Sequence, residues 1–170
     1  KLKSCILCKE NSYLCIVSDI GRIIKIKITE NNFPFMGKLA QGTNIIKLFP
    51  GENIIEALSF QEEKNKDLIL ITNKGSFIKH ETKKIKISKK GALGIMGIHF
   101  KDNKKNKDRI INCFINNKYI YIKTNMERYQ NLKTDQIDNS LYKKENKLNI
   151  ELHDNEFIKS TFSMIIPEKD

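Results

Sequence analysis

The chain repeats a unit of slightly over fifty residues, and this repeat limits the folds that it can adopt. Residues 14–25 return as residues 68–79: in each copy an apolar run leads to a polar turn that ends in glycine, and then to a strand-like stretch that carries lysine. Two further matches follow in the same order: 40–48 with 92–100, and 52–58 with 108–114. A repeat of this length that is built from short strands is typical of propeller-like arrays.

The first unit, residues 11–60, contains four stretches that favour β-strands. These stretches are 13–18, 22–29, 41–49 and 54–60. The turn between the first two ends at Gly21, and glycine suits a tight turn with positive φ. In the second stretch isoleucine alternates with Lys25 and Lys27, and this period of two predicts a half-buried strand with a basic outer face.

The second unit, residues 61–116, follows the same plan around the turn Asn73-Lys74-Gly75. Its strands are expected at 67–72, 76–80, 92–100 and 109–115. The third unit, residues 117–166, keeps less of the pattern, because Glu127 stands where the earlier units have the turn glycine. Its strands are expected at 118–124, 148–152 and 157–166, and the only helix candidate is Met126–Leu132.

These units predict an all-β, propeller-like fold of about three blades, each a four-stranded antiparallel sheet. Residues 1–10 then form the end of a preceding blade, so we expect the chain to be part of a larger disc. The third unit is the degenerate last blade, since terminal repeats commonly diverge where one side lacks a neighbour.

The charge is strongly basic and unevenly spread. The chain has 31 basic and 20 acidic residues, a net charge of +11, of which residues 61–109 carry +8. A concentrated basic surface indicates a polyanionic partner. Lysine outnumbers arginine 28 to 3, and isoleucine and asparagine are also abundant, so an A·T-rich genome explains part of the excess.

The four cysteines do not form a complete metal site. Cys5 and Cys8 have the spacing of half a zinc site, but no second pair or Cys/His cluster follows them. Cys15 and Cys113 lie in apolar runs and are expected to be small buried core residues of a protein in a reducing compartment. Metal binding is therefore the weaker alternative.

Neither a membrane segment nor a catalytic set stands out. No run of about 18 apolar residues is present, and the first ten residues lack the apolar stretch of a signal peptide, so we expect a cytoplasmic protein without a membrane partner. The sequence offers no carboxylate pair, Ser/His/Asp set or phosphate-binding loop in a supportive context. We expect no catalytic site and no cofactor in this chain.

Both units share an ordered series of short motifs. In each unit an apolar strand leads to Ser/Thr-x-x-Gly and then to a basic strand, at Ser18–Lys25 in the first unit and at Thr72–Lys79 in the second. After a loop, a glycine precedes an apolar stretch, Gly42 in the first unit and Gly94 in the second. The first unit then continues with Gly51–Ile55. In order and spacing these elements resemble the C-terminal domain of the DNA gyrase A subunit and its topoisomerase IV counterpart. The resemblance is clear over 13–116 and fainter beyond, and residues 35–42 are similar to the cyanobacterial branch.

The resemblance implies a β-pinwheel, a disc of four-stranded blades that bends duplex DNA around a basic rim. It implies as partners double-stranded DNA, the other domains of the A subunit and the ATPase subunit of the parent enzyme, with a nucleoid-associated location in the cytoplasm. The nucleophilic tyrosine, metal site and ATPase site of that ATP-dependent type II topoisomerase lie in other domains, so the resemblance assigns none of them to this chain.

One gyrase hallmark is missing. The Gln-Arg-Arg-Gly-Gly-Lys-Gly box has no match, and residues 41–42 and 89–91 are only partial echoes. Either the box lies upstream of this chain, or the protein is a paralogue that lacks the box and wraps DNA more weakly. Whether the parent is of the gyrase or the topoisomerase IV type stays open.

The function favoured by the sequence is therefore non-catalytic binding and bending of duplex DNA. Lysine is a flexible point charge, which suits phosphate neutralisation without base reading. Tyr13, Phe77 and Tyr119 are able to stack on bases, but core positions are the expectation for them. The candidate phosphate contacts are Arg22, Lys25, Lys27, Lys38, Lys74, Lys79, Lys83, Lys84, Lys89 and Lys90. The alternative is a protein-interaction propeller whose basic face binds an acidic partner.

Overall fold

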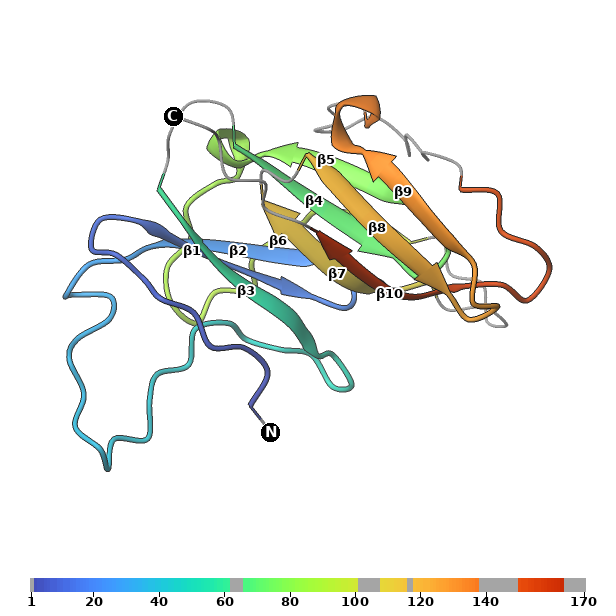
Figure 1. Ribbon diagram of the computed structural model, residues 1–170. Coiled ribbons are helices and arrows are strands. Elements are labelled where there is room, and N and C mark those ends of the chain that lie inside the picture. The colour runs from blue at the N-terminus through green and yellow to red at the C-terminus, as the bar shows by residue number, and fades with distance from the viewer. Residues whose placement is uncertain (1, 62–65, 101–107, 116–117, 138–149, 164–170) are drawn as a thin grey trace.

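The computed structural model of the chain describes residues 2–61, 66–100, 108–115, 118–137 and 150–163 (Figure 1). Its elements are β1 (Tyr13–Ser18), β2 (Arg22–Lys27), β3 (Ile54–Phe60), β4 (Asp67–Thr72), β5 (Phe77–Glu81), the 3-10 turn η1 (Thr82–Lys84), β6 (Ile95–Met96), β7 (Ile110–Ile115), β8 (Tyr119–Thr124), β9 (Tyr129–Lys133), the 3-10 turn η2 (Thr134–Gln136) and β10 (Ile158–Ser163). Over these ranges the only helical segments are the two short turns, and β1, β3 and β4 have the predicted bounds.

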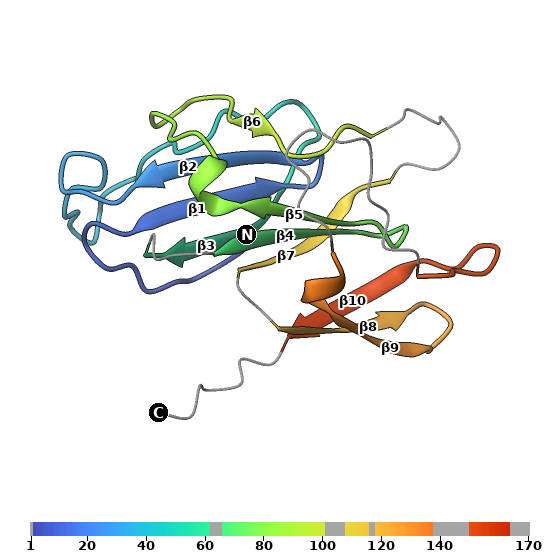
Figure 2. The same cartoon turned by 90° about the horizontal axis from the view of Figure 1, so that it is seen from above.

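The strands form three antiparallel sheets, so the all-β, multi-blade prediction is confirmed, although only the first of the described sheets has the predicted four strands. Their strand orders are β3-β1-β2-β6, β5-β4-β7 and β10-β8-β9. In each sheet the first strand of a hairpin lies at the centre, between its hairpin partner and the strand that ends the unit. In Figure 2 the third sheet is set apart from the other two, whose strands overlap in this view. Each sheet is one blade.

The blades are held together by apolar contacts between their faces. Val17 and Ile23 of the first blade pack in one core with Leu68 and Leu70 of the second. The other face of β4 carries Ile69 and Ile71, and these pack in a second core with Ile120 and Ile122 of the third blade. Neighbouring residues of β4 therefore enter different cores, and the strand is buried on both faces.

The first blade is also covered on its outer face. Leu14, Ile16, Ile24 and Ile26 form a third core cluster, against which the segment between β2 and β3 contributes Ile46 and other partly buried residues. The prediction of a half-buried β2 is therefore wrong: every residue of this strand except Lys27 is buried.

Strand β6 belongs to the second repeat in sequence but to the first blade in space. Ile95 pairs with Ile23, and Met96 with Arg22. Gly94 precedes this pairing at φ +79°, and a β-carbon there would lie 2.5 Å from the carbonyl oxygen of Ile23. Close strand packing thus explains this glycine. The structure differs here from the expectation that 92–100 forms a strand of the second blade.

Two other expectations are corrected by the structure. The segment 41–49 is not a strand: its one bridge joins Ile46 to Ala92, and much of it is exposed. The helix candidate Met126–Leu132 instead forms the hairpin turn before β9 and most of β9 itself. Of the strand expected at 148–152, residues 150–152 are irregular and the rest lies outside the described residues, as do 164–166.

The Ser/Thr-x-x-Gly motif closes the hairpin turn of the first two blades, and Thr124–Glu127 closes that of the third blade in the same way. The hydroxyls of Ser18, Thr72 and Thr124 accept hydrogen bonds from the backbone N–H groups four residues later. The third residue after each hydroxyl has positive φ: +86° at Gly21, and +60° at Glu127 in the degenerate blade. Glu127 therefore holds a left-handed conformation that costs a non-glycine residue roughly 1–2 kcal/mol.

The cysteine prediction is confirmed for the two core residues. Cys15 and Cys113 lie in the same core cluster, whereas Cys5 and Cys8 are exposed. Burial raises the pKa of the Cys15 thiol to about 12, although the charge of Lys25 acts in the opposite direction. Burial also raises the pKa of Cys113 well above its usual range.

We expect a water-soluble disulfide reagent at pH 8 to modify Cys5 and Cys8 rapidly and to leave Cys15 and Cys113 unmodified, because the buried thiols neither ionise nor meet the reagent. Absorbance of the released thiolate counts the modified groups, and the denatured protein serves as the control for all four. Fast modification of all four thiols in the native protein would contradict the described core.

Candidate nucleic-acid interface

The three central hairpins point the same way, which gives the molecule two chemically different ends. One end carries the turns at Gly21, Gly75 and Glu127, and is called here the turn end. At the other, called the open end, β2, β5 and β9 finish. Figure 1 shows η1 and η2 at the open end, at the top of the view. Thr82 and Thr134 begin these turns, and each donates its backbone N–H to the residue that precedes the first strand of its own hairpin.

Lysines of two repeats meet at the open end. The segment that follows η1 runs beside β2: Ile87 bridges to Lys25 in a parallel sense, and the N–H of Ser88 donates to the carbonyl oxygen of Lys25 at 2.7 Å. Two residues beyond this bridge lie Lys27 in one segment and Lys89 in the other. The residues of this group, which we call the basic rim, are Lys27, Lys83, Lys84, Lys86, Lys89 and Lys90.

Most of the basic rim is accessible. Lys27, Lys83, Lys86 and Lys89 are exposed, and Lys90 is half-buried. Lys84 is exposed but forms an ion pair with Glu81 at 2.7 Å, so its charge is partly neutralised. Lys86 was not among the candidates from the sequence, although its place in the alternating run 85–87 is the signal that identifies it. On the third blade, exposed Lys118 and Lys133 continue the positive charge along the open end.

Three of the predicted site residues lie away from the basic rim. Lys38 is exposed in the long segment between β2 and β3, and Lys74 is exposed in the hairpin turn at the opposite end. The side chain of Lys79 is only 13% exposed, and its ammonium lies 3.9 Å from the carboxylate of Asp67. Arg22 and Lys25 are buried, as described below, so the structure brings together five of the ten predicted residues: Lys27, Lys83, Lys84, Lys89 and Lys90.

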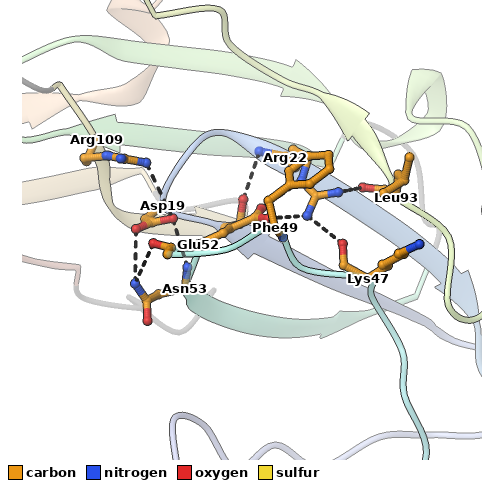
Figure 3. A network of polar contacts seen from close by, with 10 residues as sticks. Asp19, Arg22, Lys47, Phe49, Glu52, Asn53, Leu93 and Arg109 are labelled. Atoms are coloured by element: carbon orange, nitrogen blue, oxygen red, sulfur yellow. Dashed lines mark hydrogen bonds and ion pairs between the residues drawn. The ribbon is translucent and has the colours of Figure 1, made fainter. Parts of the chain in front are cut away.

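Arg22 is not on the surface, and its proposed phosphate contact is wrong. It is 3% exposed, and its guanidinium forms a bidentate ion pair with the carboxylate of Glu52. It also donates to the carbonyl oxygens of Lys47 and Leu93, and its Cζ lies 4.3 Å from the centre of the Phe49 ring (Figure 3). Arg22 thereby joins β2 to the segments before β3 and β6.

The carboxylate of Glu52 is stabilised in its charged form by these contacts. Burial acts to raise the pKa of Glu52, but hydrogen bonds from Arg22, from the N–H of Phe49 and from Ser18, together with the Arg22 charge, outweigh it. The pKa of Glu52 is therefore lowered from its ordinary value. The pair is a satisfied internal ion pair rather than a ligand site.

The third blade repeats this ion pair at equivalent positions. Arg128, like Arg22, follows the left-handed turn residue, and it pairs with Glu156 at 3.1 Å. Glu156 accepts the N–H of His153, as Glu52 accepts that of Phe49. The pKa of Glu156 is lowered by hydrogen bonds from Thr124 and His153 and by the charge of Arg128. The arginine and the glutamate are thus elements of blade architecture.

Lys25 is also buried, which corrects the second of the predicted contacts. It is 1% exposed, and its ammonium donates to the carbonyl oxygen of Thr82 at 2.9 Å. The same ammonium lies 4.4 Å from the centre of the Tyr13 ring and 5.9 Å from that of Phe60. Because Thr82 belongs to the second blade, Lys25 links two blades instead of facing solvent.

Among the residues that the structure describes, several cations of the turn end are paired with carboxylates. The N–H of Asn53 donates to the carboxylate of Asp19, and the guanidinium of Arg109 lies 3.9 Å from the same carboxylate (Figure 3). Glu127 forms ion pairs with Lys123 and Lys159. In the described part of the chain, the larger group of exposed lysines therefore lies at the open end.

Other kinds of site find little support in the described ranges. There, no group of three or more His, Cys, Asp or Glu side chains is placed to hold a metal ion. Nor does that part of the chain contain a helix with the length and apolar character needed to cross a bilayer.

Comparison with known proteins identifies the family. The family model described as the DNA gyrase C-terminal domain, a β-propeller, matches residues 12–60 and 66–117, more than half of the chain. The chain belongs to this family. Its blades are those of a β-pinwheel, as in the C-terminal domains of the gyrase A and topoisomerase IV subunits. No curated protein sequence matches the chain.

Solved structures of this gyrase domain family share the fold. The C-terminal domain of DNA topoisomerase IV aligns with a TM-score of 0.75 and 18% identity over 90% of this chain and 46% of its own. The DNA gyrase A C-terminal domain aligns with a TM-score of 0.67 and 16% identity over 94% of this chain and 51% of its own. The E. coli ParC C-terminal domain aligns with a TM-score of 0.66 and 15% identity over 92% of this chain and 63% of its own. The chain thus spans less than two thirds of each relative.

Replacing Arg22 is expected to destabilise this domain. Arg22→Met leaves the Glu52 carboxylate buried without its cation, which typically costs about 3–5 kcal/mol. Arg128→Met is the matched variant in the third blade, where the arginine side chain is 32% exposed although Glu156 is buried, and we expect a smaller loss because water can partly replace this cation. Urea unfolding measures both. An Arg22→Met protein that unfolds at the same urea concentration as the unaltered protein would contradict the internal role.

The contribution of Glu52 to stability is expected to depend on pH. Because its folded pKa is lowered, the contribution is present above the ordinary glutamate pKa and is lost as the pH falls through the folded value. The difference in unfolding free energy between the native protein and Glu52→Gln should be constant from pH 5.5 to about 7 and shrink below about pH 4. The exposed Glu30→Gln variant is the control. A difference that does not change with pH would contradict this assignment.

Proposed function

We propose that this chain is a non-catalytic domain of a type IIA DNA topoisomerase that binds duplex DNA without sequence preference and bends it. The basic rim is the proposed contact surface. The observation that supports this function most is the segregation of charge: lysines of two repeats meet at the open end, whereas several cations at the turn end are paired with carboxylates.

The chemistry of the basic rim suits a phosphate backbone. Duplex DNA carries one negative charge per about 1.7 Å of its axis, and lysines that neutralise phosphates release condensed counterions. The rim contains only lysine among its cations. Arginine is the residue that reads guanine through two parallel hydrogen bonds, so a lysine rim favours binding that ignores sequence.

The order of the blades suits bent DNA. Lysines at the open end come from the first blade at Lys27, from Lys89 and Lys90 in the segment that runs beside this blade, from η1 after the second blade at Lys83 and Lys84, and from the third blade at Lys118 and Lys133. A duplex that follows this end gains contacts from one blade after another. Bending a short site by 40–90° costs of order 1–6 kcal/mol, and additional phosphate contacts offset such a cost.

The parent enzyme enters this proposal through the family. A topoisomerase that contains this domain supplies the strand-cutting and ATPase centres from its other domains and subunits, and those parts are the proposed protein partners. The proposed location is the nucleoid, where the DNA is. The domain itself would hold DNA near the enzyme and assist supercoiling or strand passage.

Charge reversal in the basic rim is the direct test. We expect Lys83→Glu/Lys89→Glu to weaken binding to a short linear duplex at least tenfold in low salt and to reduce the slope of log affinity against log salt by about two, because two phosphate contacts are lost. Electrophoretic mobility shifts across a salt series measure both quantities.

The double variant Lys38→Glu/Lys74→Glu is the matched control, because it changes the net charge equally but at positions outside the basic rim. It should bind nearly as well as the unaltered protein. Equal losses in both variants would show that total charge governs binding, and no duplex binding by the unaltered chain would leave an acidic protein as the partner of the rim.

A further inference from the structure

The outer face of the third blade differs chemically from the same face of the second. In β4 and β5 that face carries Ile69, Ile71 and Phe77, which are buried against the third blade. The equivalent positions of the third blade, 52 residues later in each case, carry Tyr121, Lys123 and Tyr129. The face that is apolar in the second blade is therefore aromatic and basic in the third blade.

These residues share one face of the sheet. Ile120, Ile122 and Leu132 turn to the core between the second and third blades, so the alternating Tyr121, Lys123, Tyr129 and Asn131 occupy the opposite side. Across the strands, Tyr121 pairs with Asn131 on one side and with Phe162 on the other. We call the set of Tyr121, Lys123, Tyr129, Asn131 and Phe162 the aromatic face.

The aromatic face has an ordered and open surface. The rings of Tyr121 and Phe162 stack with centroids 5.3 Å apart and planes 8° from parallel. Tyr129 is 64% exposed and Phe162 is 48% exposed. Together with Gln130, Asn131 and Ile122, these three aromatic residues line a shallow cavity of about 490 Å³.

Positive charge surrounds the rings. The ammonium of Lys123 lies 5.3 Å from the centre of the Tyr129 ring and forms an ion pair with Glu127. Glu127 also forms an ion pair with Lys159, whose ammonium lies 3.7 Å from its carboxylate. The exposed Lys133 is the last residue of β9 and pairs with Tyr119 of β8. Three lysines against one glutamate leave this surface positive, which suits a polyanion and not an apolar protein face.

We propose that the aromatic face binds single-stranded DNA. Exposed aromatic rings on a sheet stack with bases only where the bases are free of a duplex, and lysines beside the rings neutralise the backbone. The carboxamide of Asn131 offers a donor and an acceptor to base edges. The aromatic face shares no residue with the basic rim, although Lys133 lies at its edge on the side of the open end. The proposal therefore adds binding of unpaired DNA strands to the proposed binding of duplex DNA.

The test uses the whole chain and a fluorescently labelled oligothymidylate of about 12 nucleotides, a length within the usual range of single-strand sites. We expect saturable binding by fluorescence anisotropy. Tyr129→Ala and Phe162→Ala should each weaken it at least fivefold, consistent with the usual effect of losing a stacking partner. Because the chain has no Trp, quenching of tyrosine fluorescence reports the contact independently.

Two controls separate this proposal from duplex binding on the basic rim. Phe157→Ala removes a half-exposed aromatic ring that does not line the cavity, and it should leave oligothymidylate binding unchanged. Tyr129→Ala should also leave duplex affinity unchanged, whereas Lys83→Glu/Lys89→Glu should weaken duplex binding far more than oligothymidylate binding.

Three results would overturn the proposal. The first is no oligothymidylate binding in low salt. The second is binding that is lost in the rim variant but kept in Tyr129→Ala and Phe162→Ala, which would assign single strands to the basic rim. The third is self-association that Tyr129→Ala abolishes without any oligothymidylate binding, which would make the aromatic face a contact between copies of the chain.

Discussion

The packing of each blade against its neighbours on both faces governs the rest of this structure. In β4 successive residues enter two different cores, and in β2 only the last residue is exposed. A cation on such a strand has no path to solvent, so it has to find its partners inside. Lys25 finds a carbonyl oxygen and two aromatic rings, and Arg22 finds a carboxylate and two carbonyl oxygens. Lys25 and Arg22, which the sequence pattern places on a basic surface, instead stabilise the interior.

This packing explains which features could be predicted from the sequence. Local sequence patterns were sufficient to predict strands β1, β3 and β4 and the glycine turns, because these elements depend on residues that are close together in the chain. Alternation of isoleucine with lysine, however, is the same for a strand with one solvated face and for one whose lysine is satisfied internally. The partner of Lys25 lies 57 residues away, at Thr82, and no local pattern contains that information.

The exchange of β6 between blades sets a second limit on prediction from the repeat. The repeat places 92–100 in the second unit, but backbone pairing places Ile95 beside Ile23 in the first blade. A repeat in sequence fixes which segments are equivalent and leaves open which blade each one completes. The same limit applies to 41–49, the equivalent of that segment in the first unit, which has no full strand partner within the part of the chain that the structure describes.

The distribution of cations follows from these constraints. Arginine, with its planar fork, occupies the turn end, where Arg22 and Arg128 each meet a glutamate within one blade. Lysine gathers at the open end, where the connections between blades emerge and side chains reach solvent. Lys133 stands where the open end meets the outer face of the third blade. A duplex on the basic rim and an unpaired strand on the aromatic face would therefore approach each other at this corner, because the phosphates of both are drawn to the same charge.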